Sequence, residues 1–116
     1  MGDGEPRGNL VTAYEETALR WEELQADSSE ANEVFTENHS IYKRLRDEEE
    51  GRAAIARLMA HESKAVRLLA ATHSLAWEPD TAEGTLEAIV REGGLTAVTA
   101  KYTFRSYRTG GLDLDW

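Results

Sequence analysis

The sequence contains no cysteine, only two prolines and no long apolar run. Without cysteine the chain can form neither disulfides nor thiolate metal sites, which fits a cytoplasmic protein. No stretch approaches the roughly 18 apolar residues that a membrane-spanning helix needs. Residues 1–8 also lack the apolar core of a signal peptide. We therefore expect a soluble, cytoplasmic protein.

Spacings typical of metal binding or catalysis are also missing. His39, His61 and His73 have no glutamate three or four residues before them and no histidine four residues after them. No serine lies in a glycine-flanked elbow, and the two glycine pairs lack the spacing of a phosphate loop. We therefore expect no metal, no cofactor and no enzyme activity. An enzyme that uses carboxylate chemistry is a less favoured alternative.

The formal net charge of −9 is unevenly distributed along the chain. Residues 1–50 hold 14 acidic and 5 basic residues, whereas residues 51–116 hold 8 of each. One interpretation is that these charges only keep the helix faces soluble. The other is a docking surface for a basic protein, because a patch of one sign steers association and repels nucleic-acid phosphates.

Apolar residues at helical spacing predict two amphipathic helices in the first half of the chain. The first is expected over about residues 9–26, with Asn9 as its N-cap. The second is expected over about residues 27–47, because Asp27 and Glu30 have the spacing of a capping box. Asn38 falls on the apolar side of this second helix. Since a buried amide must find hydrogen-bond partners, we expect Asn38 to bond to a neighbouring helix or loop.

Four further helices are predicted in the second half, over about residues 51–60, 63–77, 80–92 and 95–108. The fourth carries apolar residues on two sides, which indicates a central helix. Asp80 and Glu83 have the spacing of a second capping box and would start the fifth helix. The pair Gly93-Gly94 separates the fifth helix from the sixth.

The stretch from Leu58 to Pro79 resembles a HEAT repeat. The resemblance rests on a hydrophobic pair before a short polar turn, Val66-Arg67 early in the second helix, the pair Ala70-Ala71, and a leucine before the proline. It departs from the HEAT pattern in the turn, which is not rich in aspartate, and at His73, where a small apolar residue is commoner. The resemblance implies helical hairpins that bury their faces by stacking.

The resemblance favours an all-α chain of about six helices in three stacked antiparallel pairs, a short α-α superhelix. An up-and-down bundle is the alternative. The expected organisation is a flexible tail over residues 1–8, one domain over residues 9–109 and a second tail over residues 110–116. The region from Asn9 to Arg108 also resembles a small bacterial family of HEAT-like domains of unknown function, through Ala31-Asn32, Leu45-Arg46 and the pairs named above. That family resemblance implies the fold and no activity.

The C-terminal tail alternates apolar and acidic residues after Gly110-Gly111. Its leucines and Trp116 either fold back onto the last helices or are offered to a partner, where a tryptophan could be a hot spot.

Partner contacts are predicted on the polar faces of the second, fourth and sixth helices, which would line the concave side of a superhelix. Arg67 has a competing structural role, because the arginine of HEAT-like repeats often pairs with acidic groups of adjacent turns. A basic patch on the sixth helix could also indicate a DNA-binding repeat, but the acidic first half argues against phosphate binding. The candidate partner-binding residues are Glu30, Glu33, Glu37, Arg44, Lys101, Arg105 and Trp116, with Lys64 and Arg67 as further candidates on the fourth helix.

The favoured hypothesis is a non-enzymatic protein-binding domain. Its most concrete form is a bacterial immunity protein that covers a basic toxin domain with an acidic surface. The alternative is a HEAT-like scaffold or regulatory module that binds another cellular protein. We expect neither nucleic acid, nor membrane, nor a small-molecule substrate as a partner.

Overall fold

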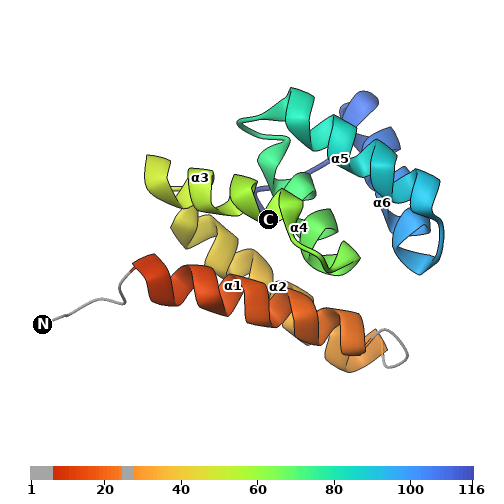
Figure 1. Ribbon diagram of the computed structural model, residues 1–116. Coiled ribbons are helices and arrows are strands. Elements are labelled where there is room, and N and C mark those ends of the chain that lie inside the picture. The colour runs from red at the N-terminus through yellow and green to blue at the C-terminus, as the bar shows by residue number, and fades with distance from the viewer. Residues whose placement is uncertain (1–6, 25–27) are drawn as a thin grey trace, which may run out of the picture. The chain divides into compact units, whose positions relative to one another are not determined.

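The computed structural model describes residues 7–24 and 28–116, and within these ranges the chain is all-α (Figure 1). The prediction of an all-α chain with about six helices is therefore confirmed. None of the described helices combines the length and the apolarity that a membrane crossing requires. The helices are α1 (Arg7–Glu23), α2 (Ser28–Leu45), α3 (Glu49–Arg57), the short 3-10 helix η1 (Leu58–Ala60), α4 (Lys64–Ser74), α5 (Pro79–Glu92) and α6 (Leu95–Arg108).

Contacts divide the chain into two compact units, Met1–Ile55 and Ala56–Trp116. The boundary falls inside α3. We had predicted one domain over residues 9–109 with three stacked pairs, and that arrangement stays a prediction. The predicted tail over residues 1–8 is too long at its end, because Arg7 and Gly8 already belong to α1. Residues 1–6 lie outside the described part of the chain.

In the first unit, α1 and α2 pack side by side as a helical hairpin. Asn38 of α2 is fully buried, and its amide nitrogen donates hydrogen bonds to the Tyr14 carbonyl and the Thr17 hydroxyl of α1, both at 3.0 Å. The predicted hydrogen-bonding role of Asn38 is therefore confirmed. These bonds join residues that lie 24 and 21 positions apart in the sequence, one on each helix. They therefore fix the register of α2 against α1.

The helix starts in this unit differ from those predicted. Asn9 lies inside α1 and is not its N-cap, because α1 begins at Arg7. The predicted cap at Asp27 lies outside the described residues. We expected the third helix to start at Gly51, but α3 begins at Glu49 and buries this glycine against the end of α2. A Cβ atom at Gly51 would overlap the carbonyl oxygen of Leu45, so the close approach requires glycine.

In the second unit, α4 is the central helix, as its two apolar sides predicted. It contacts η1, α5 and α6, and eight of its eleven residues are buried. The buried side chains include Val66 and Leu68, which have no exposed surface. Ala65, Ala70 and Ala71 are also fully buried, and such small side chains allow neighbouring helices to approach closely.

Two of the helix starts in this unit test the predicted caps. The polar pair Glu62-Ser63 in the sequence predicts a turn and a cap for the fourth helix. The Ser63 hydroxyl accepts a hydrogen bond from the Val66 amide at 3.3 Å, so this cap is confirmed. The predicted cap at Asp80 is wrong, because α5 begins with Pro79 in its first turn and Glu78 at the N-cap position. Proline suits this position, since its missing N–H would have no partner in the first turn.

Glycines end the last two helices. Gly93 and Gly94, with φ of 81° and 88°, make the turn between α5 and α6. After α6, the Gly110 amide donates to the Tyr107 carbonyl and the Gly111 amide donates to the Ser106 carbonyl. Together with the positive φ of Gly110, this is a Schellman motif, which explains why the predicted tail starts at residue 110.

Candidate functional site

Exposed glutamates of α2 form the first candidate surface, which we call the acidic face of α2 (Glu30, Glu33 and Glu37). Their spacing of three and four residues places them along one side of the helix, and all three side chains are exposed. Glu37 also lies 3.9 Å from Arg20 of α1, an exposed ion pair. Arg44 is exposed seven residues beyond Glu37, so it continues the same row with the opposite charge.

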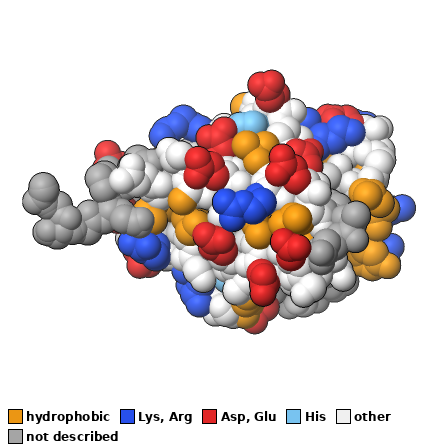
Figure 2. Space-filling model, turned by 90° about the horizontal axis from the view of Figure 1, so that it is seen from below, with side chains coloured by type: hydrophobic (Ala, Val, Ile, Leu, Met, Phe, Trp, Pro, Cys, Tyr) orange, Lys and Arg blue, Asp and Glu red, His pale blue; other side chains and the backbone are white. Residues whose placement is uncertain are grey.

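The acidic face of α2 belongs to a strongly acidic unit. Residues 1–55 hold 14 acidic and 6 basic residues, a net charge of −8, whereas residues 56–116 hold 8 and 7, a net charge of −1. Figure 2 shows a face of the protein on which acidic side chains lie interspersed with basic and hydrophobic ones. A net negative charge of this kind attracts a basic macromolecule and repels a polyanion.

The second candidate surface lies on α6. Among the described residues, the exposed large apolar side chains are Leu95, Val98, Tyr102 and Trp116. The first three are 73%, 54% and 65% exposed, and their positions i, i+3 and i+7 place them on one stripe of α6. Only Ala100 of this helix is fully buried. Contiguous exposed apolar surface is a common feature of protein-interaction sites.

Basic residues run along one edge of this stripe. Lys101 and Arg105, both predicted as contact residues, are exposed there, and α6 contains no acidic residue. We call Leu95, Val98, Lys101, Tyr102 and Arg105 together the α6 surface. The sequence predicts the two basic residues as contacts but not the apolar stripe, because helical periodicity alone does not tell an exposed apolar side chain from a buried one.

Two hollows flank the α6 surface. One, of about 310 Å³, is lined by Val98, Lys101, Tyr102 and Arg105. The other, of about 450 Å³, lies between α5 and α6, and its lining contains two apolar residues, three basic residues and one acidic residue: Glu87, Val90, Arg91, Lys101, Phe104 and Arg105. Both hollows therefore share the basic pair Lys101 and Arg105.

The tail residues have intermediate positions. Leu112 and Leu114 are half-buried, whereas Trp116 is 48% exposed. The amide of Asp115 donates to a carboxylate oxygen of Asp113 at 2.8 Å, which gives the tail a local turn. Both alternatives for the tail, folding back onto the last helices or contact with a partner, therefore stay predictions.

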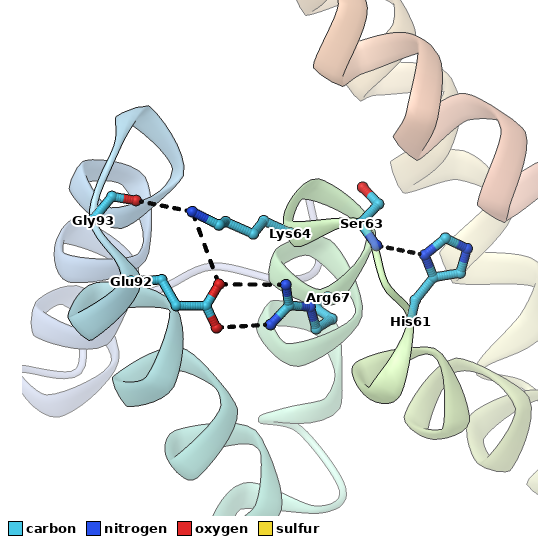
Figure 3. Close-up of polar contacts among 6 residues, drawn as sticks. All are labelled: His61, Ser63, Lys64, Arg67, Glu92 and Gly93. Carbon is cyan, nitrogen blue, oxygen red and sulfur yellow. Dashed lines mark hydrogen bonds and ion pairs between the residues drawn. The ribbon is translucent and has the colours of Figure 1, made fainter.

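The two cationic candidates on α4 both pair with the C-terminal end of α5. Arg67 donates two hydrogen bonds to the Glu92 carboxylate, at 3.0 and 3.4 Å, and Lys64 lies 3.8 Å from the same group (Figure 3). Lys64 also reaches the Gly93 carbonyl at the end of α5, at 3.5 Å. The hydrogen bonds from Arg67, with the charges of both cations, lower the pKa of Glu92. The structural role predicted for Arg67 is therefore confirmed.

The histidines have different environments. His73 is buried in α4. The position of His39 beside Glu37 in the sequence predicts that it faces solvent, and that prediction is wrong. It is only 3% exposed, and its ring lies 5.1 Å from that of Tyr42. In the turn before α4, the Nδ1 of His61 accepts a hydrogen bond from the Ser63 amide at 2.9 Å (Figure 3).

Metal-ligating side chains do not cluster in the described ranges. No set of three or more histidine, aspartate or glutamate side chains is placed there to hold a metal ion. Burial, with a smaller effect of Tyr42, raises the pKa of the Tyr14 phenol well above its usual value. This tyrosine has no exposed surface, so its raised pKa reflects the core of the α1–α2 hairpin.

Comparison with known proteins gives one match. A family model described as a domain of unknown function (DUF2019) matches residues 9–107. No curated protein and no solved structure matches the chain.

Proposed function

The chain belongs to the DUF2019 family of domains of unknown function, and from this premise we propose that it is a non-enzymatic protein-binding domain. In its most concrete form, it is a cytoplasmic immunity protein that neutralises a basic bacterial toxin domain. The acidic face of α2 makes the contact. The observation that carries this proposal is the row of exposed glutamates in a unit with a net charge of −8.

The geometry of the row suits contact with a protein surface. The Cα atoms of Glu30 and Glu37 are about 10 Å apart along a helix at about 1.5 Å per residue. A rigid helix thus presents three carboxylates at fixed spacing, and the buried Asn38 holds this helix against α1. Preorganised charges of this kind raise the rate of association with a partner of opposite charge and select against partners of like charge.

Inhibition in this proposal needs no chemistry from the chain. A toxin that acts on nucleic acid must bind phosphates with lysines and arginines, and carboxylates can occupy those same groups. Binding there would cover the toxin's active site and block its substrate. Exposed charge pairs act mainly on association rate, so binding should weaken as salt rises.

The test uses toxin-like basic domains encoded beside the gene, purified and titrated against this chain by calorimetry, with toxin activity measured in parallel. The triple variant Glu30→Lys, Glu33→Lys, Glu37→Lys should bind at least about 10-fold more weakly, and inhibition should fall with it. The matched control reverses three exposed glutamates of the second unit, Glu62, Glu78 and Glu87, and makes the same change in net charge. Equal losses in both variants, or no binding by any neighbouring basic domain, would refute the proposal.

A further inference from the structure

We infer that the α6 surface is a second docking site, which takes an acidic amphipathic helix from a protein partner. It is separate from the acidic face of α2, lies in the other compact unit and has the opposite charge. The inference therefore does not depend on the toxin proposal.

The apolar stripe indicates that the partner segment is a helix. Leu95, Val98 and Tyr102 span two turns of α6 on the side opposite Ala100. A helix covers such a stripe by laying its own apolar residues, at i, i+3 and i+7, into the grooves beside it. The hollows along Lys101 and Arg105, of about 310 and 450 Å³, provide such grooves. Tyrosine and arginine, both present here, are the residue types that often dominate binding energy.

Charge sets the chemistry of the occupant. α6 carries Lys101, Arg105 and Arg108 and no carboxylate, within a chain of net charge −9. Arg108 lies 3.4 Å from Glu83 of α5, which leaves Lys101 and Arg105 as the cations beside the stripe. The hollow between α5 and α6 adds Arg91 to this pair and only one acidic residue. Glutamates on the flanks of an incoming helix would therefore meet opposite charges.

Charge also argues against a symmetric pairing of two copies through α6. Such a dimer would bring two helices together that hold three basic residues each and no acidic one. The acidic face of α2 in a second copy would match the charge of α6. Because that face consists of glutamates, it would leave the apolar stripe exposed to water. An acidic amphipathic helix satisfies both the apolar and the basic parts of the surface.

The experiment uses a synthetic helical peptide that has leucine at i, i+3 and i+7 and glutamate on both flanks. Its binding to the full chain is followed by fluorescence anisotropy and by amide chemical shifts in NMR. Two comparison peptides are a scrambled sequence and one with lysine in place of every glutamate. We expect the acidic peptide to shift the amides of α6, and both comparison peptides to bind at least about 10-fold more weakly.

Variants of the chain localise the effect. Lys101→Glu with Arg105→Glu should weaken binding of the acidic peptide at least about 10-fold, and Val98→Ser with Tyr102→Ser should do the same. Arg44→Glu, an exposed charge reversal on α2, should change it less than about 2-fold. Circular dichroism of each variant serves as the control for retained helical structure.

Three results would overturn the inference. The first is the absence of shifts in α6 at saturating acidic peptide. The second is equal binding of the lysine peptide, which would leave no role for charge. The third is sedimentation of the wild-type chain as a dimer that Val98→Ser with Tyr102→Ser abolishes, which would assign the surface to a second copy.

Discussion

The two compact units join their helices through different kinds of side chain. In the first unit a buried amide, Asn38, ties α2 to α1 through two hydrogen bonds. In the second unit the central helix α4 is buried mainly through aliphatic side chains, and its ion pair between Arg67 and Glu92 lies near the surface. The comparison teaches that the first unit has a polar link in its core, whereas the second unit has a mainly apolar core and a polar link near its surface.

Their surfaces differ in the same sense. The first unit exposes a row of glutamates, whereas the second leaves an apolar stripe uncovered beside two basic residues. Since these surfaces suit partners of opposite charge, changes in one unit should affect stability or binding in ways that changes in the other do not.

The largest loss of stability is expected from Leu68→Ala in α4. Leu68 has no exposed surface, so its removal leaves a cavity in the centre of the second unit. We expect a loss of about 2–5 kcal/mol in the free energy of unfolding, measured by urea denaturation. Val98→Ala on the exposed stripe is the control and should change stability by less than about 0.5 kcal/mol. A similar loss for both variants would contradict the central position of α4.

Gly51→Ala should come next, with a loss of about 3 kcal/mol, because the new methyl group would overlap the Leu45 carbonyl. Gly84→Ala in α5 is a matched control, since its Cβ would meet nothing within 4 Å. In an open helical position alanine should stabilise by about 0.5–1 kcal/mol. In thermal denaturation, the melting temperature should therefore fall in Gly51→Ala and rise in Gly84→Ala. A shift in the same direction in both variants would refute the close approach at Gly51.

Asn38→Ala tests the polar lock of the first unit. The Thr17 hydroxyl and the Tyr14 carbonyl would each lose a buried donor, at a cost of about 2 kcal/mol. Asn32→Ala changes an exposed asparagine of the same helix and should have little effect. Hydrogen exchange should also quicken at the amides of α1 and α2 in Asn38→Ala. Unchanged exchange there would show that the amide does not hold the hairpin.

The smallest effect is expected from the ion pair between Arg67 and Glu92. Since the folded-state pKa of Glu92 is lowered, its contribution to stability is present above the unfolded pKa and is lost as the pH falls through the folded pKa. NMR titration of the Glu92 carboxyl should show a higher pKa in Arg67→Met than in the wild type. An unchanged pKa would mean that the pair does not form in solution.

The helices and the buried amide followed from the sequence because both depend on periodicity. Asn38 shares a face with Val34, Ile41 and Leu45, so its burial could be inferred without a structure. Helix starts were harder to predict. At Asp80 the capping-box spacing competed with the preference of Pro79 for the first turn, and the proline determined the start.

Burial at the edge of an apolar face could not be predicted in the same way. His39 lies next to the buried stripe of α2, and contact with the Tyr42 ring decides its environment. The fourth helix, predicted to carry apolar residues on two sides, is buried as α4, whereas α6 leaves Leu95, Val98 and Tyr102 exposed. Periodicity reveals a second apolar side but does not say whether the chain itself supplies a layer to cover it. The structure shows that the apolar stripe of α6 is exposed, and this exposure identifies the α6 surface.

The central claim, that the two units bind partners of opposite charge, is tested most directly by one crossed binding measurement. The glutamate-reversed variant of α2 and the variant Lys101→Glu with Arg105→Glu are each titrated with the basic toxin domain and with the acidic helical peptide. The account predicts that the first variant loses the toxin and keeps the peptide, whereas the second loses the peptide and keeps the toxin, each by at least about 10-fold. The account would be contradicted if one variant lost binding to both ligands. It would also be contradicted if neither variant lost binding to either ligand.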